Sequence, residues 1–152
     1  MIIRKIPMDA IQKGVFSILS TKQSTPVYDD VPSVMYDEDG NPILDEDENP
    51  IPVRLPYITL GAFTCKPSGN KTVDMSEISQ QIHIWSDYSG KTEVNGIAND
   101  ITAVLTSWPI DLSADGFEVM SQDVDFFEAF ASKNDGYHGV LTFVSKIQNI
   151  GA

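Results

Sequence analysis

The segment Ile78-Ser79-Gln80-Gln81-Ile82-His83-Ile84-Trp85, together with the residues that follow it as far as Trp108, decides the fold of this chain. Its isoleucines recur at every second position, which is typical of a strand with one buried face. After Ser86-Asp87-Tyr88-Ser89-Gly90 the apolar residues recur every three or four positions, which predicts a helix that ends before Pro109. The buried stripe of that helix comprises Val94, Ile97, Ala98, Ile101, Val104, Leu105 and Trp108.

Outside this unit the sequence predicts one further helix, over residues 7–20, and strands over residues 57–64 and 117–127 and after Asn134-Asp135-Gly136. The last strand should place Tyr137, Leu141, Phe143 and Ile147 on one face. Strands outnumber helices and do not alternate regularly with them. We therefore expect one α+β domain over residues 1–152, with an antiparallel or mixed sheet packed by two helices and a loose tail over residues 148–152.

The composition restricts the classes of function. A net charge of -12 argues against nucleic-acid binding, which depends on Lys and Arg neutralising phosphates. Cys65 is the only cysteine, so no intrachain disulfide is expected, and no apolar run is long enough for a membrane helix. The first residues do not resemble an export signal. We expect a protein made in a cytoplasm.

Much of the acidity belongs to an insertion at about residues 35–53, in which seven of the twelve residues from Asp37 to Glu48 are acidic. The insertion repeats itself, because Asp37-Glu38-Asp39-Gly40-Asn41-Pro42-Ile43 is followed eight residues later by Asp45-Glu46-Asp47-Glu48-Asn49-Pro50-Ile51. Asp39-Gly40 favours a tight turn. The sequence predicts a protruding, solvated β-hairpin with residues 34–36 and 43–44 as its arms.

No set of residues in the chain has the pattern of a catalytic or metal site. Cys65, His83 and His138 lack the spacing of zinc ligands. The acidic insertion approaches a calcium-loop pattern but has Pro42 where that loop needs glycine. Ser89-Gly90-Lys91-Thr92 ends like a phosphate-binding loop, yet Trp85 occupies the place of its first glycine. We expect no enzyme, no cofactor and no metal, with weak divalent binding by the carboxylates as the alternative.

Several segments resemble, in order, those of a family of small tail-completion proteins of long-tailed bacteriophages and prophages. They are Thr25–Pro32, Leu55–Gly61, the strand end His83-Ile84-Trp85-Ser86 with the helix after it, and Tyr137–Phe143. The resemblance spans most of the chain apart from the acidic insertion. It implies the same compact domain of sheet and helices.

The resemblance also implies a non-enzymatic role. Such a protein would form a ring, as a homo-hexamer, at the head-proximal end of the virion tail, where it ends growth of the tail tube and meets the tube protein on one side and the head connector or stopper on the other. DNA would pass through without specific binding. The alternatives are another neck or tube component, namely a connector stopper or a tail tube protein, and a metal-binding protein or hydrolase that uses the acidic cluster.

Aromatic residues near the ends of predicted elements are candidates for contacts with other subunits or partners. These candidates are Tyr57, Trp85, Tyr88 and Phe127. Trp108, which ends the apolar stripe, is expected to belong to the core instead. The carboxylates of the insertion are candidates for a surface that lines the opening of the ring, where they would repel DNA phosphates. They are Asp37, Glu38, Asp39, Asp45, Glu46, Asp47 and Glu48.

Overall fold

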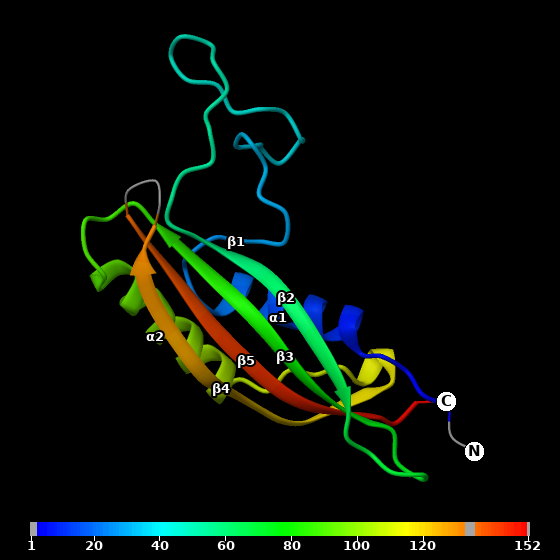
Figure 1. Ribbon diagram of the computed structural model, residues 1–152. Coiled ribbons are helices and arrows are strands. Elements are labelled where there is room, and N and C mark those ends of the chain that lie inside the picture. Colours follow the sequence, from blue (N-terminus) through cyan, green and yellow to red (C-terminus); the bar gives the residue numbers. More distant parts are fainter. Residues whose placement is uncertain (1–2, 133–135, 152) are drawn as a thin grey trace.

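Two helices lie on one face of a five-stranded sheet in the computed structural model, which describes residues 3–132 and 136–151 (Figure 1). In chain order the elements are α1 (Met8–Lys22), β1 (Val27–Tyr28), β2 (Tyr57–Pro67), β3 (Met75–Ser86), α2 (Thr92–Ser107), the short 3-10 helix η1 (Ser113–Asp115), β4 (Phe117–Ala131) and β5 (Tyr137–Asn149). The strand order is β1-β2-β3-β5-β4, and every pair is antiparallel except β1 with β2. The predicted α+β domain with a mixed sheet and two helices is confirmed.

The strand and helix on which the fold prediction rests both form. In β3 the even-numbered residues, including Ile78, Ile82 and Ile84, are buried against the helices. In α2 the predicted stripe is buried from Val94 to Leu105. The prediction for the end of the stripe is wrong, because the helix ends at Ser107 and Trp108 has an extended backbone that leaves its side chain 48% exposed.

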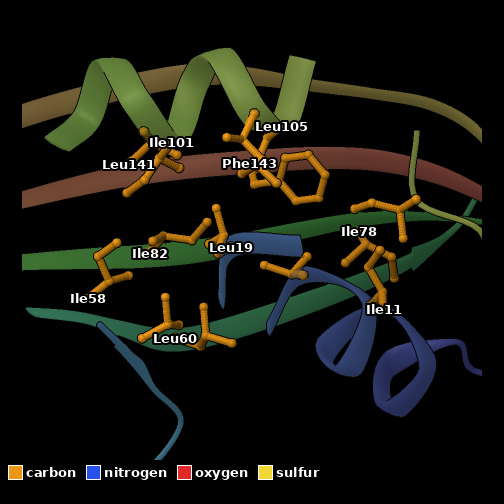
Figure 2. Close-up of a cluster of buried hydrophobic side chains, with 14 of the residues drawn as sticks. Ile11, Leu19, Ile58, Leu60, Ile78, Ile82, Ile101, Leu105, Leu141 and Phe143 are labelled. Atoms are coloured by element: carbon orange, nitrogen blue, oxygen red, sulfur yellow. The ribbon is translucent and has the colours of Figure 1, made fainter. Parts of the chain in front are cut away.

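The core lies between the two helices and the sheet face that they cover (Figure 2). Ile11 and Leu19 of α1, Ile101 and Leu105 of α2, and Phe143 of β5 are fully buried there. Each such side chain stabilises the fold by roughly 1.5–3 kcal/mol relative to an exposed position. The last strand therefore buries the face that the sequence predicts, with Leu141, Phe143 and Ile147 pointing inward.

Strand β4 does not alternate as simply as the sequence predicts. Its pairing with β5 shifts register between Val119 and Ser121 and again between Val124 and Phe126, so the strand carries two β-bulges. Each bulge adds one residue and exchanges the faces of the residues beyond it. Consequently Phe127, and not Phe126, pairs opposite the inward-facing Leu141.

The C-terminal residues are held by hydrogen bonds, so the prediction of a loose tail is wrong for residues 148–151. Residues 148 and 149 belong to β5, and the Asn149 N–H donates to the Asp74 carbonyl at 2.9 Å. The N–H groups of Ile150 and Gly151 both donate to the Gly116 carbonyl at 2.9 Å. Ala152 lies outside the described residues.

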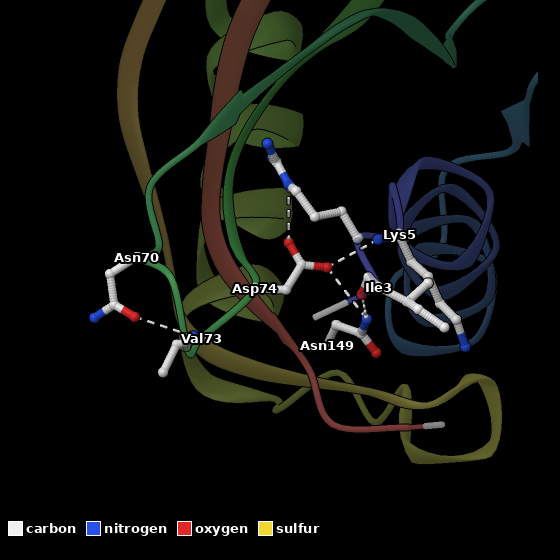
Figure 3. A network of polar contacts seen from close by, with 7 residues as sticks. Ile3, Lys5, Asn70, Val73, Asp74 and Asn149 are labelled. Atoms are coloured by element: carbon white, nitrogen blue, oxygen red, sulfur yellow. Dashed lines mark hydrogen bonds and ion pairs between the residues drawn. The ribbon is translucent and has the colours of Figure 1, made fainter. Parts of the chain in front are cut away.

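Asp74 joins the two ends of the chain to the β2–β3 connection (Figure 3). Its carboxylate accepts hydrogen bonds from the Lys5 N–H at 2.8 Å and the Asn149 amide at 3.1 Å, and it lies 3.5 Å from the Arg4 Nε. Burial by itself raises the pKa of Asp74, but the three partners outweigh burial and hold that pKa below its ordinary value.

Candidate interaction surfaces

The acidic insertion forms an arm, residues 34–52, that stands off from one end of the sheet (Figure 1). Three backbone hydrogen bonds close its base into a triangle. The Met35 N–H donates to the Ile51 carbonyl at 2.7 Å, Ile43 to Met35 at 3.0 Å and Ile51 to Ile43 at 2.9 Å. These residues are eight apart, so the sequence repeat sets the geometry of the arm.

Each copy of the repeat makes the same acidic turn. The Asp37 carboxylate accepts hydrogen bonds from the N–H groups of Asp39 and Asn41, and the Asp45 carboxylate accepts them from Asp47 and Asn49. The turn over residues 37–41 agrees with the predicted hairpin, and Tyr36 bridges to Pro42 between the two arms expected from the sequence. The second, equivalent turn over residues 45–49 was not anticipated. The seven carboxylates of residues 37–48 are exposed.

The face of the sheet opposite the helices carries a histidine–aromatic cluster formed by His83, Trp85, Phe130 and His138. The His138 ring stacks on Trp85 with 3.8 Å between centroids and meets the edge of Phe130 at 4.8 Å. The two imidazoles share a hydrogen bond between His83 Nδ1 and His138 Nε2 at 2.8 Å. The cluster therefore crosses three neighbouring strands, β3, β5 and β4.

Both histidines of this cluster favour the neutral form. Partial burial lowers the pKa of His83, and burial together with the neighbouring His83 lowers the pKa of His138. One imidazole donates the shared proton and the other accepts it, which needs at least one neutral ring. At neutral pH the cluster itself is thus uncharged and aromatic.

The structure does not bring the four predicted contact residues to one surface. Tyr57 and Trp85 are paired residues of β2 and β3, and the Tyr57 ring meets the edge of Tyr28 at 5.8 Å. Tyr88 is exposed in the loop before α2. Phe127 lies on the helix side, where a Cβ added at Gly139 would come within 3.0 Å of its ring.

The side chain of Trp108, which was predicted to belong to the core, is about half exposed. The Lys22 ammonium lies 4.2 Å above the centre of its ring, a cation–π contact between the ends of α1 and α2. Grooves lined partly by Lys22 and Trp108 run on both sides of this pair. The signal that could have identified this exposure is Pro109, because the residue before a proline disfavours helical backbone.

Over the described ranges 3–132 and 136–151, no three His, Cys, Asp or Glu side chains are placed to hold one metal ion. In the same residues no helix is long and apolar enough to span a membrane. The features that stand out on the described surface are the acidic arm, the open sheet face and the two sheet edges.

The two edges of the sheet are largely uncovered. Strand β4 is the last in the strand order, and no strand in the described part of the chain pairs with its outer side. At the opposite edge β1 pairs with Ile58 and Thr59 alone. The rest of β2, from Leu60 to Pro67, has no strand partner on that side among residues the structure describes.

Comparison with known proteins finds a family model and similar solved structures. The model of the family described as "Tail completion protein gp17" matches residues 37–147. No curated protein matches the sequence. Among solved structures, one chain from "Virion of native gene transfer agent (GTA) particle" is similar with a TM-score of 0.74 and 20% sequence identity, over 93% of this chain and 96% of that chain. The likeness shows a shared fold over nearly the whole of both chains.

Proposed function

The chain belongs to the family of the tail completion protein gp17, and from this membership we propose that it completes a phage-type tail by forming a ring at the head-proximal end of the tail tube. The family makes it a structural protein of a tail. The ring would end growth of the tube and join the tail to the head. Its partners would be further copies of itself, the tail tube protein and the head connector or stopper.

The observation that carries this proposal is the extent of the family match. It runs without a break from the acidic arm through β2, β3, α2 and β4 into β5. The shared fold with a chain of a virion particle supports the same role, because it extends over 93% of this chain and 96% of that chain. Binding, and not catalysis, is the proposed action.

A ring at this position must let DNA pass, and the acidic arm supplies a physical reason why DNA would not adhere. Carboxylates repel phosphates, whereas a basic lining would release counterions and hold the duplex. We therefore propose that the arm faces the opening of the ring. The rival placement is on the outside, where the arm would clasp the neighbouring subunit through the exposed apolar residues Tyr36 and Leu44.

The proposal is tested by deleting the gene in the phage or prophage that carries it and viewing the lysate by negative-stain electron microscopy. Filled heads lying apart from tubes of uneven length are expected, and a plasmid copy of the gene should restore joined particles. Joined particles of normal length in the deletion strain would overturn the proposal. Long fibres formed by the purified chain alone would favour a tube protein instead.

A further inference from the structure

We infer that neighbouring subunits of the ring join edge to edge, with strand β4 of one copy pairing beside the open part of β2 of the next copy. This inference rests on the proposed ring. The sheet would then continue from subunit to subunit, and each joint would use two different surfaces, as closed heterologous assemblies require.

The first support is that both edges offer unpaired backbone groups. Strand β4 is 15 residues long and forms one edge of the sheet, while β1 covers only Ile58 and Thr59 at the other edge. Exposed edges of this length are templates for pairing with another chain, and soluble monomers usually protect them with lysine or proline. Strand β4 contains neither, and its own protection consists of four carboxylates and two bulges, which a partner edge of opposite charge would accommodate.

The second support is the exposed apolar surface of β4. Met120 and Phe126 are 50% and 51% exposed, and Phe127 and Phe130 are also exposed. Four large apolar side chains on one edge strand form a surface that burial in an interface would stabilise. Phe126 and Phe127 are consecutive and point to opposite faces of the strand, so a sheet continued across this edge would cover apolar side chains on both faces.

The third support is that the two edges carry opposite charge. The acidic residues of β4 are Glu118, Asp123, Asp125 and Glu128, and the strand has no basic residue. Residues 54–71, which include β2, contain Arg54, Lys66 and Lys71 and no acidic residue. The acidic β4 edge of one copy is therefore complementary in charge to the basic β2 edge of the next copy. This attraction favours pairing of these two edges over pairing of like edges.

The direction of pairing follows from the sheet. Strands β2 and β4 run in opposite directions within one subunit, since three antiparallel pairs separate them. Rotation about a ring axis that runs along the strands keeps those directions, so the new pair would be antiparallel. The register of the sheet puts Lys66 of β2 level with Ser121 of β4, through the pairs Lys66–Glu77, Glu77–Lys146 and Lys146–Ser121. Measured along the strands, Lys66 therefore lies between Glu118 and Asp123.

Charge reversal tests the joint in two separate variants and their combination. One variant carries Glu118→Lys, Asp123→Lys and Glu128→Lys, and the other carries Arg54→Glu, Lys66→Glu and Lys71→Glu; all six residues are exposed. Like charges would face each other in either variant alone. A chain with both sets has complementary edges again in a ring of any size.

Two readouts are used: sedimentation of the purified chains over a range of concentrations, and the number of joined particles when each variant replaces the gene. Each single set is expected to weaken assembly by at least roughly tenfold, because like charges would then face each other across the joint. The combined set should recover most of the loss. A matched control with Asp9→Lys, Asp100→Lys and Asp115→Lys, exposed residues of the helical side, should assemble like the unaltered chain.

The outcomes separate this inference from the proposed function. If deletion of the gene detaches heads from tails but either single set restores joined particles fully, the edge pairing is wrong and the function stands. Folded single-set variants whose combination fails to recover assembly would also overturn the pairing. If the deletion strain makes normal particles, the proposed function is wrong. The edge pairing is then tested by sedimentation of the purified chains alone. An unaltered chain that stays monomeric by sedimentation and is dispensable for joining would overturn both.

Discussion

At the residue scale, Asp74 shows how one buried carboxylate connects distant parts of the chain. It receives the Lys5 N–H and the Asn149 amide, which are 69 and 75 residues away along the sequence. An asparagine here would keep one acceptor oxygen but lose the negative charge, and would place an amide donor against one of the three donors, which costs about 1–3 kcal/mol. Asp74→Asn should therefore lower the free energy of unfolding by about that amount in urea unfolding at pH 7, whereas Asp100→Asn on the exposed side of α2 should have little effect.

The pH dependence of the same carboxylate has a defined sign. Because its pKa is lower in the folded than in the unfolded chain, the folded state is stabilised above the ordinary Asp pKa of about 3.9, and that stability is lost as pH falls through the folded value. The unaltered chain should lose more unfolding free energy than Asp74→Asn between about pH 5 and about pH 3. Equal losses in the two proteins would contradict the assignment.

His83 and His138 also have lowered pKa values, but for a base this means that folding favours the neutral form. Below the ordinary His pKa of about 6.5 the unfolded chain takes up protons before the folded chain does, so stability falls as pH falls below that value. His138→Gln removes one titrating group and the repulsion between two imidazolium rings. It should reduce the drop in unfolding free energy between about pH 7.5 and pH 5.5. An unchanged drop, measured by urea unfolding at both pH values, would show that the pair does not titrate as proposed.

Trp108 and Leu105 provide a matched comparison at the end of α2. Leu105 is fully buried, whereas Trp108 is about half exposed beside Lys22. Leu105→Ala should cost about 2–5 kcal/mol of unfolding free energy, as core truncations do. Trp108→Ala should cost clearly less despite its larger ring. If thermal or urea unfolding showed the larger loss for Trp108→Ala, the side chain would belong to the core after all.

At the element scale, the acidic arm is a self-contained unit that enters and leaves the domain at nearly one point. The Met35 N–H and the Ile51 carbonyl are 2.7 Å apart, and Val34 bridges to Pro52. Replacing residues 36–50 by two glycines should leave the unfolding free energy within about 1 kcal/mol of the original, because no core residue is removed.

The effect of this deletion on assembly distinguishes the two placements of the arm. Complete particles that eject their DNA poorly would support an arm facing the opening of the ring. Loss of ring formation by a chain that is still folded would support a clasp between subunits. A second variant keeps the full length of the arm and changes residues 38–40 and 46–48 to uncharged amides or glycine. It separates the effect of the arm's charge from the effect of its shape.

The elements also show which features could be predicted from sequence. Strand β3 and helix α2 were predicted because one buried face imposes a period on each, and that period is local. The bulges of β4 could not be predicted, since they arise from its register with β5 and leave no period of their own. They explain why the inward-facing residues change from Val119 to Val124 and back to Phe127, which a simple alternation does not produce.

At the scale of the whole molecule, the fold class followed from counting elements, but the surfaces did not. His83 and His138 are 55 residues apart and meet because β3 pairs with β5, a partnership that no local pattern encodes. The candidate residues Tyr57, Trp85 and Phe127 were chosen as aromatics near element ends, and their division between the two faces depends on tertiary register. The opposite charges of residues 54–71 and of β4 can be read from the sequence. Only the strand order shows that they lie toward opposite edges of one sheet.

The triangular base of the arm has a consequence for how this chain can vary in length. Two of its three hydrogen bonds connect residues eight apart, the third joins Met35 to Ile51, and each interval of eight carries its own aspartate-closed turn. Duplication of one whole interval in the gene would add a side to the polygon and keep every turn intact, whereas an insertion of any other length would leave one corner unmatched. We therefore expect the reach of the arm to change in steps of eight residues while the domain beneath it stays the same.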